Sequence, residues 1–399
     1  MDVPLLTRRR LSRLMALGAA SVALGCVDRS RYSEADAAAL EAQRRAERLA
    51  SGKGPYGSHV YDGYRGLAEL PWFEVDDTGR LKLVAEDVPP VIDVHGHLGM
   101  SLLLAPQIDL QARTERVEHV LDCDATDLGC KLDLDVYINS NFTSADLWAL
   151  RYDAVARLLW GSGPAQTQTL PNLLAEMDDV GVEQVAILPI AFGLPFGDDL
   201  ADRWLDAIDS CGTPDRFIRA ASVHLEDEHW REKLRSQAAR GARLVKLHPA
   251  GQRYFPDEPK AMDIYEECGR LGLVVFLHGG RAGIEPGYAH QFTLMKGYEP
   301  MLAEHPQVDF VLGHAGARDV EDAMELGRRY PNAWLGIHGQ GITVLDRLTR
   351  EVGPDRLLFG SDWPFYHLAA TLAKVLIVTE DRPDVRHAIL RGNAQRLLG

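Results

Sequence analysis

The sequence has no excess of basic residues, no early strand followed by the glycine-rich motif of dinucleotide-binding domains, and no paired cysteines of the zinc-ribbon type. Of its 399 residues, 58 are acidic and 43 are basic, so the net charge is −15. A nucleic-acid-binding protein needs a basic face to displace the counterions of the phosphates, and that class is therefore excluded. No GxGxxG motif follows an early strand, which disfavours a dinucleotide-binding domain. No CxxC pair is present, so the cysteines indicate neither a zinc ribbon nor thioredoxin chemistry.

The beginning of the chain carries the marks of an export signal. Its apolar run, Leu14–Leu24, has 11 residues, well short of the ~20 that a bilayer-spanning helix needs. A basic cluster between Arg8 and Arg13 precedes the run, which is the pattern of a secretory signal. The segment Thr7–Leu11 (TRRRL) resembles the twin-arginine export motif. We therefore expect residues 1–26 to be a signal peptide and the protein to be exported.

Three cysteines bear on this prediction. The segment Ala23–Cys26 resembles a lipoprotein cleavage box, which predicts either a lipid anchor at Cys26 or a plain cleaved peptide in which Cys26 is incidental. The protein would then be periplasmic or a membrane-anchored lipoprotein, touching the membrane only through that anchor. Cys123 and Cys130 are seven positions apart in a polar segment, and in an oxidising compartment they either bridge or remain two free thiols.

Residues 27–90 are expected to form an N-terminal appendage. Residues 33–52 are rich in Ala, Glu and Arg and end in glycine, which is typical of an exposed helix or a tether. The segment Trp72–Val84 contains two strand-like runs around Asp76–Gly79, a sequence with turn chemistry. This segment therefore predicts a β-hairpin.

From Val91 onward, short apolar runs alternate with helix-period segments. The runs are Val91–Val94, Val185–Pro189, Phe217–Val223, Leu244–Leu247, Leu273–Leu277, Phe310–Leu312, Trp334–Ile337 and Leu357–Phe359. Runs of this kind are typical of parallel strands buried on both faces. Eight such βα units in about 300 residues predict an α/β fold of the TIM (β/α)8 barrel type over residues 91–399. A doubly wound open sheet is the alternative.

One connection is too long for a single helix and loop. The first strand ends near His97 and the second begins near Val182, so residues 104–163 are predicted to be an insertion. It contains a polar stretch and a helix-period segment, Asp146–Trp160. Loops that follow barrel strands lie over the active-site mouth, so we expect the insertion to cap the substrate pocket. The alternative is a peripheral helix used for packing or dimerisation.

Polar residues stand at the predicted ends of most of these strands. His95 and His97 are two positions apart on the first strand, so their side chains can project to the same face and offer a metal two imidazoles. Similar residues follow the other strands: Lys246 and His248 the fourth, His278 the fifth, His314 the sixth, His338 the seventh, and Asp362 and Trp363 the eighth. In a TIM barrel these strand ends build the active site.

The segment from Val91 to Gly399 resembles the amidohydrolase superfamily. Within it, the sequence is similar to the amidohydrolase-related family that includes the aminocarboxymuconate semialdehyde decarboxylase group. The motifs that carry the resemblance are VIDVHGHLG, LVKLHP, FLHGG, LGHAG, FGSDWP and the closing ILRGNAQRLLG.

The resemblance implies a set of metal ligands and a catalytic group. His95, His97, His278 and Asp362 would bind one divalent metal, usually zinc, and His314 would act on the substrate beside it. Three imidazoles and one carboxylate independently suit Zn²⁺, with Mn²⁺ or Fe²⁺ as alternatives. Asp362 is expected to accept a proton as well as bind the metal, which makes it catalytic with His314.

Further residues are expected to contact the substrate. These are Lys246, His248, Arg281, His338 and Trp363. Some members of the superfamily carry a carbamylated lysine on the fourth strand that bridges two metals, so a two-metal site at Lys246 is the alternative for that residue.

Three functions fit these residues. The first is a metal-dependent hydrolase that attacks an amide, ester or lactone carbonyl of a small organic molecule. The second is a metal-dependent, non-oxidative decarboxylase (a carboxy-lyase) on the same site. The third is a non-catalytic metal-binding lipoprotein. The partner expected in the first two is a small-molecule substrate, and a homodimer is expected from the family alone.

Overall fold

The structure is a computed structural model that describes residues 27–103, 105–124, 130–143, 146–147, 150, 161–194 and 196–399. The predicted signal peptide, Cys26, and most of the helix expected over Asp146–Trp160 lie outside the described residues. Within the described part of the chain, no helix is both long and apolar enough to cross a bilayer.

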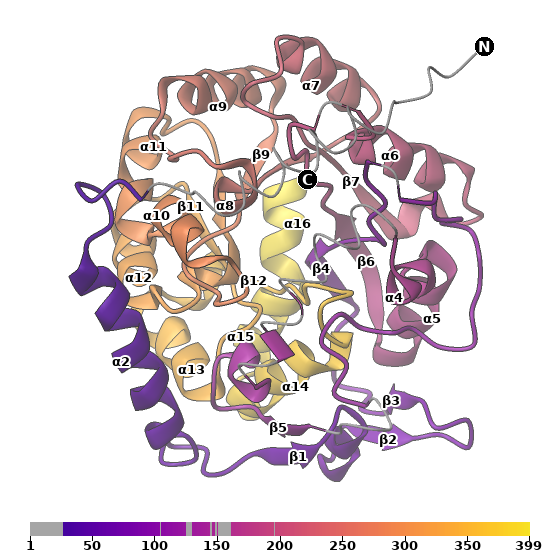
Figure 1. Ribbon diagram of the computed structural model, residues 1–399. Helices are drawn as coiled ribbons and strands as arrows, with labels where there is room; N and C mark the ends of the chain where they lie inside the picture. The colour runs from indigo at the N-terminus through magenta and orange to yellow at the C-terminus, as the bar shows by residue number, and fades with distance from the viewer. Residues whose placement is uncertain are drawn as a thin grey trace.

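The described residues form a parallel, eight-stranded sheet that closes into a barrel, which confirms the predicted TIM-barrel fold (Figure 1). The strands are β4 (Val91–Gly96), β6 (Val182–Ile187), β7 (Phe217–Ala221), β8 (Leu244–Leu247), β9 (Val274–Leu277), β10 (Phe310–Leu312), β11 (Ala333–Gly336) and β12 (Leu357–Leu358). Each pairs with the next in chain order. The ring closes between the first and last strands, where Val94 N donates to Phe359 O and Gly96 forms a parallel bridge with Trp363.

Helices follow the strands, and most of them surround the barrel, whereas α16 (Asn393–Leu398) lies across its centre (Figure 1). The longer ones are α5 (Leu170–Val180), α6 (Leu200–Ser210), α7 (Trp230–Ala239), α9 (Pro259–Leu271), α11 (Glu299–Glu304), α12 (Val320–Arg329), α13 (Ile342–Glu351), α14 (Leu368–Val378), α15 (Pro383–His387) and α16. Two of them, α5 and α9, end at glycines in the left-handed conformation, Gly181 and Gly272, as their sequences predict.

The barrel strands separate two apolar cores. Side chains that face inward, including Ile92, Val94 and Phe276, fill the barrel together with Ala394 of α16. Val91 and its outward-facing counterparts pack instead against the surrounding helices. The barrel is therefore a filled core rather than a pore.

The N-terminal appendage packs on this barrel. Helix α2 (Glu34–Ala50) begins at the capping box of Ser33 and lies on the outside of the molecule, indigo in Figure 1. The strands β2 (Phe73–Val75) and β3 (Leu81–Leu83) pair antiparallel as a hairpin. A third short strand, β1 (Val60–Asp62), pairs with β5 (Lys131–Asp133) of the insertion.

The insertion is cross-linked within itself and hydrogen-bonded to the appendage. Cys123 and Cys130 form a disulfide, so of the two alternatives left by the sequence the bridge is the one present. Nearby, Tyr64 N donates to the carboxylate of Asp124 at 2.7 Å. The appendage and the insertion thus hold each other beside the barrel.

Candidate metal centre

Two histidines and one aspartate converge on a single point at the carboxyl end of the barrel. His95 is the last residue but one of β4, His97 directly follows that strand, and Asp362 lies in the loop after β12. The Nε2 atoms of the two histidines are 3.0 Å apart, and Asp362 Oδ1 lies 3.4 Å from that of His95 and 3.3 Å from that of His97. All three residues are at most 4% exposed. They form a group that can hold a metal ion.

Hydrogen bonds fix the tautomers of both histidines. His97 Nδ1 donates to Leu188 O at 2.6 Å. His338 Nε2 accepts from the backbone N–H of His314, so it is also the acceptor for His95 Nδ1, 2.7 Å away. Each ring therefore carries its proton on Nδ1 and directs a lone pair from Nε2 to the shared point. Burial and the charge of Lys246 hold the pKa of His95 well below its usual value, which keeps that ring neutral. This donor set fits a divalent metal.

The buried carboxylate of Asp93 forms hydrogen bonds to the two segments that carry these ligands. Asp93 accepts from His95 N at 2.8 Å and from the backbone and hydroxyl of Ser361 at 3.1 and 2.5 Å. Burial raises the pKa of Asp93 to about 7, although the hydrogen bonds from Ser361 and His95 oppose that rise. Asp93 thus joins the backbone before His97 to the backbone before Asp362.

His314 belongs to a second chain of hydrogen bonds. His278 Nε2 lies 2.7 Å from Glu285 Oε1, and a carboxylate can only accept, so His278 donates there. In the neutral ring His278 Nδ1 then accepts from His314 Nε2 at 3.1 Å, and His314 Nδ1 accepts from the hydroxyl of Tyr137 at 3.2 Å. Burial and neighbouring histidines hold the pKa of His314 well below its usual value, so this ring is neutral.

The positions of His278 and His338 differ from the four-ligand set implied by the resemblance. His278 is held by Glu285 and His314, and neither of the two metal-holding groups found among the described residues includes it. The second of these groups consists of His314, His338 and Asp362. The metal role of His278 and the substrate role of the fully buried His338 stay predictions.

Lys246 points into the centre, and His248 lies at its side. Lys246 Nζ is 3.2 Å from His95 Nε2 and 4.5 Å from the ring centre of Phe276. Burial lowers the pKa of Lys246 to about 7, with the charge of Asp362 opposing. His248 stacks on His278 with ring centres 4.1 Å apart. The substrate roles of both residues stay predictions.

Arg281 and Trp363 are directed elsewhere. The guanidinium of Arg281 binds the carboxylate of Asp319 and donates to the backbone O of Asp36 in α2 at 2.5 Å. The indole of Trp363 is fully buried, and its Nε1 donates to Glu176 at 3.1 Å. Their predicted contact with substrate stays untested.

The insertion supplies a cover over the centre. Tyr137 reaches His314, Ile138 N donates to Gly339 O at 2.8 Å, and Asn139 Nδ2 donates to Ala282 O at 2.9 Å. Outside this cover, Glu47 of α2 binds Tyr137 N and lies 3.6 Å from Arg318 Nε. The described residues of the insertion and α2 thus contact the loops at the carboxyl end of the barrel, and the role of the whole insertion as a cap stays a prediction.

A comparison with protein families decides the assignment. The sequence model described as amidohydrolase matches residues 92–399, which is most of the chain. The protein is a member of the amidohydrolase family. The resemblance drawn from its strand-end motifs is therefore confirmed. No curated protein matches the sequence.

Solved structures share the fold of this amidohydrolase. A 5-carboxyvanillate decarboxylase from Novosphingobium aromaticivorans, complexed with manganese and a nitrobenzoic acid, is 15% identical, with 79% of this chain and 98% of that chain covered and a TM-score of 0.54. A 2,6-dihydroxybenzoate decarboxylase from Rhizobium is 19% identical, with 77% and 98% covered and a TM-score of 0.50. A TIM-barrel protein from Bordetella bronchiseptica is 23% identical, with 59% and 84% covered and a TM-score of 0.50. At these identities the likeness establishes the fold.

The sequence did not reveal three residues that shape the amidohydrolase site. Tyr137 and Glu285 end the chain of hydrogen bonds through His314, and Glu176 binds the indole beside Asp362. Only Glu285 carries a local signal, because it lies seven positions after His278 in the loop that follows β9. The other two reach the site from distant parts of the chain.

Proposed function

We propose that the protein is a metal-dependent hydrolase that cleaves an amide, ester or lactone bond of a small organic molecule. The observation that carries the proposal is the convergence of His95 Nε2, His97 Nε2 and Asp362 Oδ1 on one buried point, with His314 close by. Zn²⁺ suits two imidazoles and a carboxylate best, and Mn²⁺ or Fe²⁺ are alternatives. When bound, the metal polarises a carbonyl and lowers the pKa of water toward ~7.

The residues around that point divide the work of hydrolysis. Asp362 directs Oδ1 to the metal position, and its carboxylate can take the proton of the attacking water. His314 carries its proton on Nε2, which donates to His278 Nδ1 in this conformation, so this proton has to leave that hydrogen bond before it can pass to the oxyanion or the leaving group. Lys246 and His248 would then line the substrate side.

The buried arginines favour a substrate without its own carboxylate. Arg281 is neutralised by Asp319, with 2.5 Å between the closest atoms, and Arg318 lies 3.6 Å from Glu47. Neither guanidinium is available for the bidentate recognition of a substrate carboxylate in this conformation. A neutral carbonyl compound fits this charge balance.

A decarboxylase is the second candidate, and two observations support it. The centre is buried beneath Tyr137 and its neighbours, which suits a reaction that must keep water away from a carbanion-like state. The fold is also shared with the decarboxylases named above. In this case Lys246, which no carboxylate pairs with at close range among the described residues, would face the substrate carboxylate.

One screen separates the two candidates. The purified protein, loaded with Zn²⁺ or Mn²⁺, is incubated with panels of lactones, esters, amides and hydroxybenzoates, and both hydrolysis products and carbon dioxide are measured. We expect hydrolysis that is lost with a chelator and restored by metal. Carbon dioxide release without hydrolysis would establish the second candidate instead. Metal binding without either product would favour the non-catalytic alternative.

Two variants assign the residues within this site. Asp362→Asn should lose bound metal and turnover together, because it removes a charged ligand. His314→Ala should keep the metal and lose turnover by about 10²- to 10⁴-fold, the range for a general acid or base. Metal content is measured by elemental analysis after dialysis, with Asp384→Asn on the exposed face of α15 as the control. Metal loss in His314→Ala would make His314 a ligand.

A further inference from the structure

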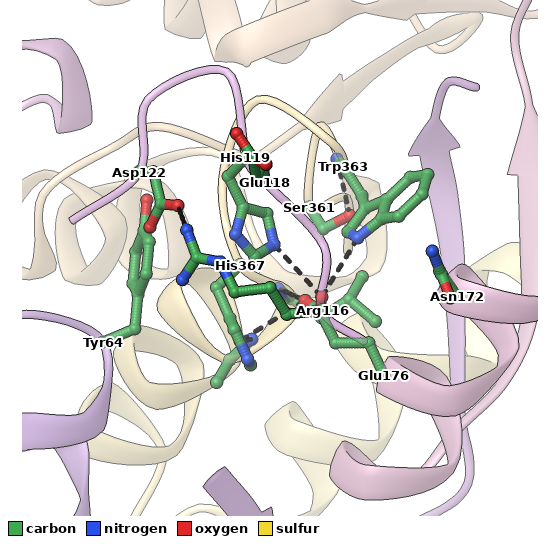
Figure 2. A network of polar contacts seen from close by, with 12 residues as sticks. Tyr64, Arg116, Glu118, His119, Asp122, Asn172, Glu176, Ser361, Trp363 and His367 are labelled. Carbon is green, nitrogen blue, oxygen red and sulfur yellow. Dashed lines mark hydrogen bonds and ion pairs between the residues drawn. The ribbon is translucent and has the colours of Figure 1, made fainter. Parts of the chain in front are cut away.

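A second buried polar cluster lies beside the metal centre and takes no part in the proposed reaction. Its centre is Glu176, in the second half of α5, which is buried. Figure 2 shows His119 and Trp363 directed at this carboxylate from different parts of the chain. The cluster therefore joins a barrel helix, the insertion and the loop after β12.

The carboxylate of Glu176 is fully used. Its Oε2 accepts from Trp363 Nε1 at 3.1 Å and lies 3.1 Å from His119 Nε2. Its Oε1 accepts from Leu368 N at 2.7 Å and lies 3.4 Å from His367 Nδ1. Burial raises the pKa of Glu176, but the charges of His367 and His119 and the hydrogen bonds outweigh burial and lower it to about 2. Glu176 is thus an ionised acceptor held among donors.

Trp363 connects this acceptor to the metal centre, because it is the residue after Asp362. Its backbone O accepts from His97 N at 2.6 Å, and its backbone N donates to Ser361 Oγ at 3.0 Å. Its indole is fully buried and reaches Glu176. The orientation of the Trp363 backbone therefore depends on where the indole is anchored.

Asp362 needs such an anchor because of its backbone. Its φ is 64°, in the left-handed region that non-glycine residues adopt at a cost. The conformation persists only where the surroundings fix it, and here Asp362 N donates to His95 O at 2.8 Å while Phe365 N donates to Asp362 O at 2.8 Å. The hydrogen bond from the Trp363 indole to Glu176 holds the residue next to Asp362 and so adds to these two backbone bonds.

The insertion reinforces the same loop. Val120 N donates to Pro364 O at 2.9 Å and Leu121 N donates to Phe365 O at 3.0 Å. His119, the residue before them, binds Glu176 and is packed edge-on by Tyr64 with ring centres 5.7 Å apart. The side chain of Glu176 is thus shared by the loop that carries Asp362 and by the insertion that lies along it.

We propose that Glu176 is a positioning residue of the metal centre, which holds the Asp362 carboxylate toward His95 and His97 by anchoring the indole of Trp363. The proposal rests on the metal centre and not on which reaction the centre performs. Residues that orient metal ligands in this way typically change metal affinity by about 10- to 100-fold when they are replaced.

Metal affinity tests the proposal directly. Co²⁺ is titrated into the metal-free full chain in competition with a chromophoric chelator, and the ligand-field absorption of bound Co²⁺ is recorded. We expect Glu176→Gln to bind Co²⁺ about 10- to 100-fold more weakly and to shift the absorption bands, since Asp362 loses its orientation. Asp178→Asn, on the exposed face of the same helix, should match wild type within about twofold.

Trp363→Phe provides the second test, because it removes the indole N–H while His119 and Leu368 still bind Glu176. It should weaken Co²⁺ binding as Glu176→Gln does, and the double variant should be no weaker than the weaker single variant. If Glu176→Gln fails to fold, the Co²⁺ affinity of Trp363→Phe alone decides the matter. A folded Glu176→Gln or Trp363→Phe protein with wild-type Co²⁺ affinity, or losses that simply add in the double variant, would overturn the proposal.

The outcomes separate this proposal from the functional one. Equal Co²⁺ affinity in wild type and Glu176→Gln overturns the role of Glu176 and leaves the hydrolase proposal standing. A wild-type protein that binds no Co²⁺ overturns the metal centre and both proposals with it.

Discussion

The two residues that face each other across the candidate site share an unusual backbone conformation. His314 and Asp362 have φ values of 57° and 64°, and they lie two residues after the end of β10 and four residues after the end of β12. Both left-handed residues thus stand in the loops at the carboxyl end of the barrel. Such conformations cost free energy and cluster at functional sites. The chain therefore adopts an energetically costly backbone conformation at two residues of the candidate site.

Tyr137→Phe tests how His314 is prepared for that chemistry. Without the hydroxyl, Nδ1 of His314 loses its donor, and only the acceptor His278 Nδ1 still favours the proton on Nε2. We expect kcat to fall about 10- to 100-fold with bound metal unchanged, a loss at the lower end of that for a general acid. Steady-state kinetics and metal analysis measure the two quantities.

The control for Tyr137→Phe is Tyr330→Phe. This variant removes a hydroxyl that donates to Glu299. Tyr330 precedes β11, so it lies at the amino-terminal end of the barrel strands, away from the metal centre. The variant should keep wild-type kcat. An unchanged kcat in Tyr137→Phe would mean that the hydroxyl has no part in setting the tautomer of His314.

The histidines could be predicted because their signal is local. His95 and His97 share a strand face by the period of two, and each lies beside the apolar run that positions it. Tyr137 meets His314 across 177 positions, and Glu176 meets Trp363 across 187. Nothing in the neighbouring sequence encodes such contacts, since the first depends on how an irregular insertion packs on the barrel and the second on how the first barrel helix packs against the loop after the last strand.

Among the elements, the barrel strands follow their sequence closely and the insertion does not. The predicted run Leu244–Leu247 is β8 itself, and the predicted run Phe310–Leu312 is β10 itself. Short apolar runs determine these elements. The short strand β5 pairs with β1 of the appendage, a partner that neither segment predicts because both are only three residues long.

Helix α14 contains a lysine that should make stability depend on pH. Every residue of α14 is buried, and Lys374 Nζ has a hydrogen bond to Gln340 O at 2.8 Å. Burial lowers the pKa of Lys374 to about 8, although the charges of Asp133, Glu47 and Asp135 oppose this. An unfolded lysine keeps its proton to about pH 10.4, so between pH 8 and 10 the unfolded state binds more protons.

The free energy of unfolding should therefore rise with pH over this window. Wild type should gain on the order of 3 kcal/mol relative to Lys374→Met between pH 7.5 and 10. Urea unfolding of the metal-free proteins at several pH values measures the difference. Lys260→Met, at an exposed position of α9, should keep the wild-type slope. Parallel curves for wild type and Lys374→Met would contradict the prediction.

The disulfide of the insertion should contribute to stability through the unfolded state. It closes a loop with a sequence separation of seven. Chain entropy for a loop of this size corresponds to about 2.5 kcal/mol. The free energy of unfolding of Cys123→Ala/Cys130→Ala, measured with urea, should be lower than that of wild type by that amount. Cys211→Ala, which removes a free thiol, should keep the wild-type value. If the double variant matched wild type, the native bridge would be too strained to stabilise the fold.

For the whole molecule, export through the twin-arginine route stays a prediction. Arg8→Lys/Arg9→Lys should leave the protein inside the cell, because the route reads the paired arginines. Arg13→Lys, which keeps the pair, should be exported as wild type is. Fractionation of cells that produce each full-length chain measures the outcome, and an exported Arg8→Lys/Arg9→Lys protein would assign the leader to another route.

The closure of the barrel between β4 and β12 has a consequence for how the molecule opens. The hydrogen bond of Ser361 to Asp93 joins segments 268 positions apart, and the three candidate ligands straddle the same junction. A metal held there would cross-link the two ends of the barrel, so its binding free energy would also oppose separation of the first strand from the last. We expect hydrogen exchange in the metal-free protein to be fastest, among the strands, along β4 and residues 359–365. Added metal should slow exchange there far more than in β8 and β9, on the opposite side of the ring.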